Sequence, residues 1–109
     1  MPYDEMLEAR IRTIVSSWPG TDRRKMFGGV CFLGDGNMIC GVWKDYLILR
    51  LGEAGAAEAL ADPDVTPFDV TGRPMRGWVM VHRDGLIDKN VLAAWLERAR
   101  SFHATLPPK

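Results

Sequence analysis

At 109 residues, the chain has the size of one ordinary domain and can bury a single hydrophobic core. Hydrophobic side chains make up 47% of it, which excludes a disordered protein, and no apolar run approaches the ~20 residues that cross a bilayer. The charges of the 14 basic and 14 acidic side chains cancel, which disfavours tight nucleic-acid binding. Residues 70–109 carry seven basic and three acidic groups, so weak nucleic-acid binding stays an alternative.

The beginning of the sequence bears on the compartment. The first residues, MPYDEMLEARIR, are acidic and amphipathic, whereas a signal peptide starts with a basic stretch followed by an apolar one. We therefore expect a cytoplasmic protein. Because the cytoplasm is reducing, its two cysteines, Cys31 and Cys40, are expected to be free thiols.

Residues 3–18 predict an amphipathic helix, because their apolar side chains recur at intervals of three and four residues. Pro19 and Gly20 end this helix. The polar connector that follows ends in the basic run Arg23–Lys25, which is typical of a solvated loop or a strand at a sheet edge. The alternative is a contact between this run and phosphate groups.

Residues 26–51 predict a three-stranded antiparallel meander, around which the rest of the chain is organised. The Asp-Gly pair at positions 35–36 lies between two apolar runs and favours a hairpin, because both central residues of a type I′ turn need positive φ. With these residues at the turn, Cys31 faces Cys40 across the two strands. The pair is then either two small packed apolar residues or a redox pair or half of a metal site.

A second turn at Lys44-Asp45 completes the meander, and the alternation of its strands defines two faces. One face is wholly apolar and requires cover from helices. Its predicted members are Cys31, Leu33, Met38, Cys40, Val42, Leu47, Leu49 and Leu51. The other face is aromatic, with a gap at Gly41 and a charge at Arg50. Its predicted members are Val30, Phe32, Ile39, Gly41, Trp43, Tyr46, Ile48 and Arg50. Such a face is buried under a helix or in a dimer, or it stacks nucleic-acid bases.

Beyond the meander, residues 52–62 predict a short alanine-rich helix that ends at Pro63. The next residues, 63–77, are rich in Pro, Gly, Asp and Thr, so we expect an irregular connection there. Within it we predict a short strand near residues 68–70 and a turn at residues 71–74.

The C-terminal part predicts one more strand and one more helix. Residues 77–82 form the strand, with Trp78, Met80 and His82 on one side and Val79 and Val81 on the other. A turn at residues 83–85 ends it. Asp88 then caps an amphipathic helix. The apolar stripe of this helix is Val91, Leu92, Trp95, Leu96, Ala99, Phe102 and Leu106. The predicted fold is α+β, a single domain over residues 1–109. It is an antiparallel sheet, made of the meander and one or two further strands, packed with N-terminal and C-terminal amphipathic helices.

No catalytic signature is present in the sequence. There is no nucleophile elbow, no HExxH, no dinucleotide fingerprint and no Walker motif. The two histidines, His82 and His103, are expected to be ordinary surface or partly buried residues and not catalytic bases. We therefore predict no catalytic residues, no cofactor and no metal.

Three stretches, taken together, resemble one known family. They are KMFGG at residues 25–29, GNMICGV at residues 36–42 and FDVTGRPMRGW at residues 68–78. In this order, and with flanking helices, the chain is similar to the N-terminal domain of TfoX/Sxy proteins over roughly residues 3–106. It looks like a stand-alone version, without the C-terminal helical domain of the full-length regulators.

The resemblance implies a small α+β domain that is not an enzyme. In some bacteria such proteins are associated with the regulation of natural competence, as transcriptional coactivators alongside the cyclic-AMP receptor protein. The resemblance supplies no catalytic residues. Together with the aromatic face it suggests a candidate interaction surface, made of Lys25, Met26, Phe27, Phe32, Trp43, Tyr46, Arg50, Arg73, Arg76 and Trp78.

Three functional hypotheses follow. The first is a regulatory domain that binds a protein partner, which includes a second copy of the chain as a homodimer. The second is weak nucleic-acid binding through the basic run at residues 23–25 and through Arg73 and Arg76. The third is a small-molecule binder or enzyme with a pocket near residues 71–78.

Overall fold

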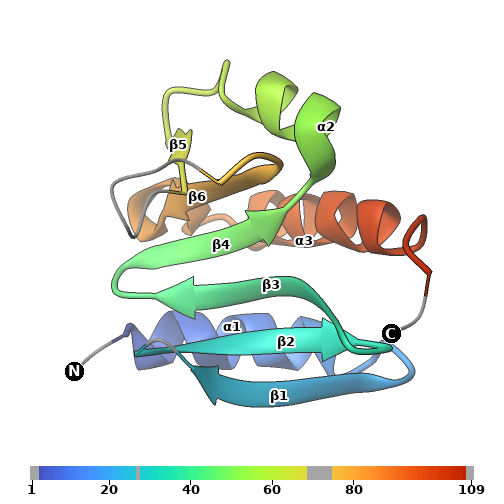
Figure 1. Cartoon of the computed structure of the whole chain (residues 1–109). Helices are drawn as coiled ribbons and strands as arrows, with labels where there is room; N and C mark the ends of the chain where they lie inside the picture. The colour runs from blue at the N-terminus through green and yellow to red at the C-terminus, as the bar shows by residue number, and fades with distance from the viewer. Residues whose placement is uncertain (1–2, 27, 69–74, 108–109) are drawn as a thin grey trace.

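The computed structural model describes residues 3–26, 28–68 and 75–107, and they form an α+β fold (Figure 1). The elements in chain order are α1 (Glu5–Val15), β1 (Thr21–Met26), β2 (Gly29–Gly34), β3 (Asn37–Trp43), β4 (Tyr46–Arg50), α2 (Gly52–Ala59), β5 (Val65–Pro67), β6 (Trp78–His82), a short 3-10 helix (Arg83–Leu86) and α3 (Lys89–His103). The predicted fold class is confirmed.

The strands that the structure describes make one six-stranded sheet in the order β1-β2-β3-β4-β6-β5, with every neighbouring pair antiparallel. The predicted meander is its centre, from β2 to β4. Three strands join it, one more than predicted, because the polar segment Thr21–Met26 pairs along its whole length with β2 as an edge strand. The strand predicted near residues 68–70 lies earlier, at Val65–Pro67, and residues 69–74 are outside the described part of the chain.

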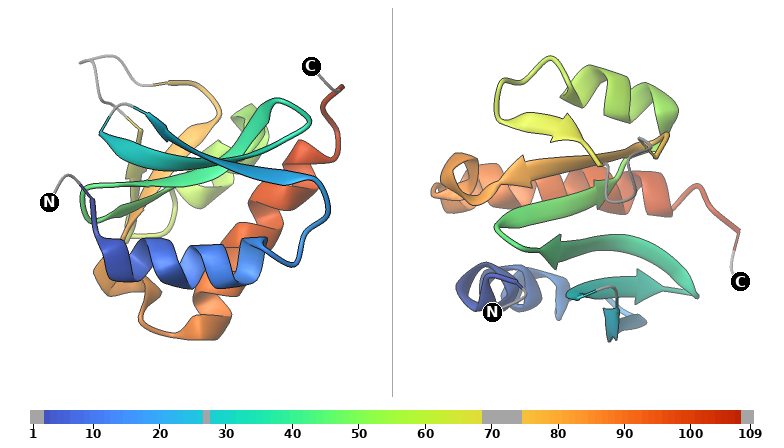
Figure 2. Two further views of the ribbon diagram at one scale, coloured as in Figure 1. Left: turned by 90° about the horizontal axis from the view of Figure 1, so that it is seen from below. Right: turned by 60° about the vertical axis from the view of Figure 1, so that its left-hand side comes forward.

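Helices α1 and α3 lie on the same side of the sheet (Figure 2). Helix α1 is shorter than the predicted 3–18, because Asp4 caps its start and accepts a hydrogen bond from the backbone N–H of Leu7 at 3.0 Å. Asp88 caps α3, as predicted, through the backbone N–H of Asn90 at 2.7 Å. Helix α2 packs at the far end of the sheet beside β6, with Ala56 and Ala59 in the core.

The β2–β3 hairpin contains a β-bulge that the sequence does not predict. Leu33 pairs with Met38, as expected. The residue before Leu33 in β2, Phe32, should then pair with Ile39, but it pairs with Cys40. Ile39 is therefore the extra residue on β3, because a bulge sets two residues of one strand against one of the other. Both Ile39 and Cys40 are buried in the core, at 2% and 0% exposure.

The bulge reverses the predicted faces on its far side. The prediction that Cys31 faces Cys40 is wrong, since Cys31 pairs with Gly41. Phe32 was predicted for the aromatic face but lies in the core at 3% exposure. Between β3 and β4 the predicted register holds, and Cys40 pairs with Leu49. The side of the sheet opposite α1 and α3 is here called the open face. It thus gains the side chains of Cys31 and Met38, and the side chains of Val30, Phe32 and Ile39 lie in the core instead.

Candidate functional site

The open face carries an apolar groove of about 330 Å³, whose lining residues expose only apolar surface. The residues that line it are Met26, Gly29, Val30, Cys31, Met38, Gly41, Val42, Trp43, Ile48, Phe68, Met75 and Trp78. Strands β1 to β4 and β6 supply its floor and sides, and Phe68 and Met75 come from the segment that joins β5 to β6. A groove of this kind is the default place to seek a binding function in a small domain.

The floor of the groove exists because two glycines bring β2 and β3 close together. A Cβ atom on Gly29 would lie 2.3 Å from the backbone oxygen of Val42. A Cβ atom on Gly41 would lie 2.6 Å from the backbone oxygen of Val30 and 3.0 Å from the Cε atom of Met38. Real Cβ atoms do not approach so closely, so β2 and β3 can lie this near to each other only with glycine at these two positions.

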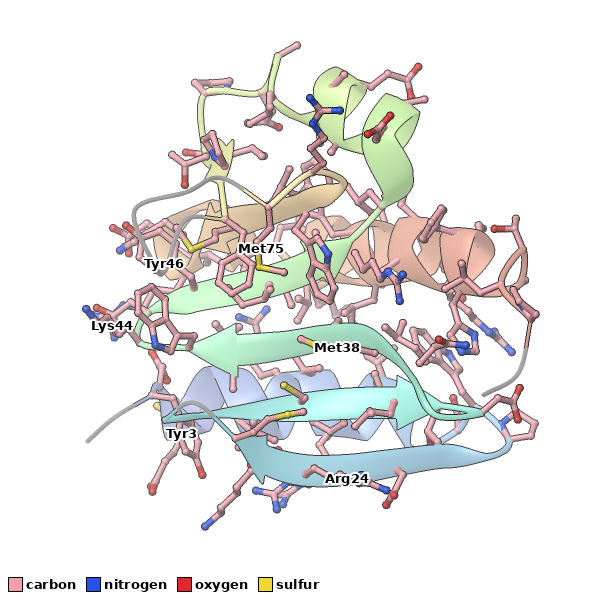
Figure 3. All side chains as sticks on the ribbon, viewed as in Figure 1. Tyr3, Arg24, Met38, Lys44, Tyr46 and Met75 are labelled. Carbon is pink, nitrogen blue, oxygen red and sulfur yellow. The ribbon has the colours of Figure 1, made fainter. Side chains whose placement is uncertain are left out.

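The walls of the groove are aromatic and rich in sulfur. Phe68 contacts Trp43 edge-on, with ring centroids 6.4 Å apart, and Trp78 at a tilt, with centroids 6.0 Å apart. Met38 lies on one side of the groove and Met75 on the other (Figure 3). Methionine is flexible and polarisable, so these walls can adapt to the shape of an occupant.

Two cations lie against the tryptophans of the groove. The Lys44 ammonium is 4.5 Å from the centroid of the Trp43 ring, and the Arg50 guanidinium is 5.5 Å from the centroid of the Trp78 ring. Arg50 also lies 5.8 Å from the ring of Phe102 on α3. Among the described residues, neither cation has a carboxylate within 4 Å.

The structure brings together about half of the ten candidate interaction residues. Three of the ten line the groove, namely Met26, Trp43 and Trp78. Two more are on the open face beside it. Arg50 of β4 pairs with Trp78 of β6, and the ring centroid of Tyr46 lies 5.2 Å from that of His82.

The other candidate residues lie elsewhere. Phe32 is in the core, and Lys25 pairs with core-facing Val30, so alternation directs it to the helix side of β1. Arg76 is exposed and pairs with Glu53 of α2 at 3.6 Å. Phe27 and Arg73 are outside the described residues.

The sequence reasoning missed several lining residues, and the causes differ. Cys31 and Met38 were placed on the covered face because nothing local signals the bulge at Ile39. Phe68 and Met75 lie in the stretch FDVTGRPMRGW, where apolar side chains stand among turn residues. That pattern could have indicated that the two side chains pack against the sheet and line the groove.

The basic run Arg23–Lys25 does not form one continuous patch. Arg23 turns to the helix side and donates a hydrogen bond to the Glu8 carboxylate at 3.1 Å, and this bond raises the pKa of Arg23. Arg24 turns to the open face and pairs with Asp22 at 3.5 Å. Because acidic partners already compensate these charges, the run gives little support to phosphate binding.

The two thiols are protected from ionisation. Burial raises the pKa of Cys31. The pKa of Cys40 is raised further, mainly by its complete burial and to a smaller extent by the nearby Cys31 thiol. Both are therefore protonated at neutral pH, which disfavours nucleophilic or redox chemistry. They also lie on opposite sides of the sheet, Cys40 in the core and Cys31 in the groove.

Both histidines hold backbone in place. Nδ1 of His82 accepts a hydrogen bond from the backbone N–H of Asp84 at 3.2 Å and caps the 3-10 helix. Nε2 of His103 lies 2.7 Å from the backbone oxygen of Gly34, which ties α3 to the β2–β3 hairpin. Within the described ranges, no three His, Cys, Asp or Glu side chains group so as to hold a metal ion. No helix in that part of the chain has the length and apolar character to cross a membrane.

A comparison with protein families gave one result that spans most of the chain. The model of the TfoX N-terminal domain matches residues 13–103. Searches of curated proteins and of solved structures gave no significant match.

Proposed function

The chain belongs to the TfoX N-terminal domain family, and from this premise we propose that it is a non-enzymatic regulatory domain that binds a protein partner through its open face. The observation that carries the proposal is the groove, an apolar surface on the side of the sheet that α1 and α3 leave uncovered. Apolar grooves on the surface of a soluble domain are common places for a partner or a ligand to bind.

The composition of the open face supports protein docking. Trp, Met and Arg are enriched in the cores of protein interfaces, and all three are present here in Trp43, Trp78, Met38, Met75 and Arg50. Methionine side chains re-pack easily, which suits a surface that accepts a flexible partner segment.

The state of the polar groups supports a role without catalysis. Both thiols have raised pKa values, and both histidines are engaged by backbone groups. A nucleophilic thiol needs a lowered pKa, and both thiols here have raised ones.

The partner that we propose belongs to the transcription machinery. TfoX-type proteins are associated with transcriptional coactivation and competence in some bacteria, and the domain here supplies a docking surface of the kind that a coactivator needs. A second copy of this chain is the alternative occupant of the open face. Sedimentation velocity over a range of concentrations distinguishes the two, because a self-docking face gives a concentration-dependent dimer.

The experiment that tests the proposal is quantitative affinity capture from the native host. The bait chains are the wild type, Met75→Glu in the groove, and Met6→Glu on α1 as a matched control. Both methionines are exposed, at 45% and 79%. We expect a partner that the wild type and Met6→Glu retain equally and that Met75→Glu loses. Equal recovery by all three chains contradicts docking through the open face.

A further inference from the structure

We propose that the groove is also a binding site for a small amphipathic carboxylate, a molecule with one apolar chain and one anionic head. This goes beyond the docking of a protein partner. A carboxylate in the groove and a docked partner would use the same apolar wall, so the inference is tested on the isolated protein, where no partner is present.

The size of the groove sets the size of the molecule. Its volume of about 330 Å³ is at the lower end of the range for small-molecule sites, roughly 300–1,000 Å³. Gly41 lines the floor without a side chain, and Trp43 and Trp78 are among the side walls. A single medium-length chain fits such a space, whereas a two-chain lipid exceeds it.

The character of the wall sets the character of the chain. The lining residues expose only apolar atoms, so a sugar or a peptide backbone placed on the floor would lose its hydrogen bonds to water without replacement. An alkyl or aryl chain loses nothing and gains contact with Met38, Ile48 and Met75. The buried part of the ligand is therefore apolar.

The charges around the groove set the sign of the head group. Lys44 and Arg50 lie against the two tryptophans of the wall, and among the described residues neither has a carboxylate within 4 Å. Arg24, a further described cation on the open face, is already paired with Asp22. The uncompensated charge beside the apolar wall is thus positive, and it favours an anion.

The test compares three probes with the same alkyl chain. Decanoate, decanol and decyltrimethylammonium are titrated into the folded chain below their micelle concentrations, and affinity is measured by isothermal titration calorimetry. We expect one saturable site with the order decanoate, decanol, decyltrimethylammonium. Binding of none of the three, or equal binding of the anion and the cation, overturns the proposal.

The location is tested by the rate at which N-ethylmaleimide alkylates Cys31, whose side chain lines the groove. Saturating decanoate is expected to slow this reaction, and Met75→Glu is expected to abolish the protection while Met6→Glu leaves it. Decanoate that binds without protecting Cys31 occupies another site and refutes the assignment.

The charge is tested with two matched double variants. Lys44→Gln/Arg50→Gln removes both cations of the groove, and Arg98→Gln/Arg100→Gln removes two cations that lie against Trp95 and Trp18, at 4.5 and 5.0 Å from the ring centroids. Since exposed charge pairs are weak, we expect the first variant to lose decanoate affinity roughly fivefold. The second is expected to bind as the wild type does. Equal losses in both variants contradict the role of Lys44 and Arg50.

Discussion

The ion pair between Glu8 of α1 and Arg23 of β1 ties the edge strand of the sheet to the helix layer. One oxygen of the Glu8 carboxylate accepts a hydrogen bond from Arg23 at 3.1 Å, and the other is buried without a hydrogen-bond partner. Arg12 remains 3.7 Å from that second oxygen. The substitution Arg23→Ala therefore leaves a buried carboxylate with one weak ionic contact and no hydrogen bond from a cation.

The magnitude follows from how deeply the pair is buried. Breaking a fully buried pair costs about 3–5 kcal/mol, and an exposed pair contributes about 0.2–1 kcal/mol. The Glu8 side chain is 6% exposed and that of Arg23 is 34% exposed, so this pair lies between the two limits. We expect Arg23→Ala to lower the free energy of unfolding by about 2 kcal/mol, or Tm by roughly 8 °C in a domain of this size.

Its neighbour Arg24 provides the control. Both side chains of the Arg24–Asp22 pair are 65% exposed, so Arg24→Ala is expected to cost less than about 0.5 kcal/mol. The assay is urea unfolding followed by circular dichroism, with a double-mutant cycle of Arg23→Ala and Glu8→Gln. A coupling energy of about 1 kcal/mol is expected. Equal destabilisation by the two arginine substitutions refutes the assignment of opposite sides to Arg23 and Arg24.

Three further predictions concern pH, packing and the thiols. The hydrogen bond from Arg83 and then that from the α1 backbone lower the pKa of Asp4 below its ordinary value of 3.8. The ionised carboxylate therefore stabilises the fold at pH values above 3.8, and this stabilisation is lost as pH falls through the lowered pKa. Asp4→Asn should lower Tm at neutral pH, and the difference in Tm from the wild type should disappear in thermal scans at acid pH. Gly41→Ala should lower the free energy of unfolding by about 2 kcal/mol or more in urea titrations, because its Cβ would lie 2.6 Å from a backbone oxygen of β2; an unchanged stability contradicts the close approach. Mass spectrometry after alkylation of the native chain should show Cys31 modified slowly and Cys40 only after unfolding, with no disulfide under mild oxidant.

Local patterns in the sequence predict most of the elements. The apolar spacing of residues 3–18 and the cap at Asp88 give two helices near their observed bounds. The Asp-Gly pair at residues 35–36 gives the first hairpin, and both residues have the positive φ that a type I′ turn needs. These signals succeed because each acts over only a few residues.

The open face could not be derived in the same way, because a long-range contact accompanies the bulge that shapes it. Ile39 lies in the core near Gly34, where the ring of His103 from α3 also packs. No residue beside Ile39 in the sequence carries that information. One extra residue exchanges the faces of β2, which moves Cys31 into the groove and Phe32 into the core.

The central claim is that the open face, and not the helix side, is where this domain meets its partner. Site-specific photo-crosslinking in the native host tests it most directly, with p-benzoylphenylalanine in place of Met75 at the groove or in place of Ile87 on the helix side. Both positions are exposed, at 45% and 79%. The account predicts a discrete crosslinked protein from Met75 and none from Ile87. A discrete product from Ile87 alone would contradict it.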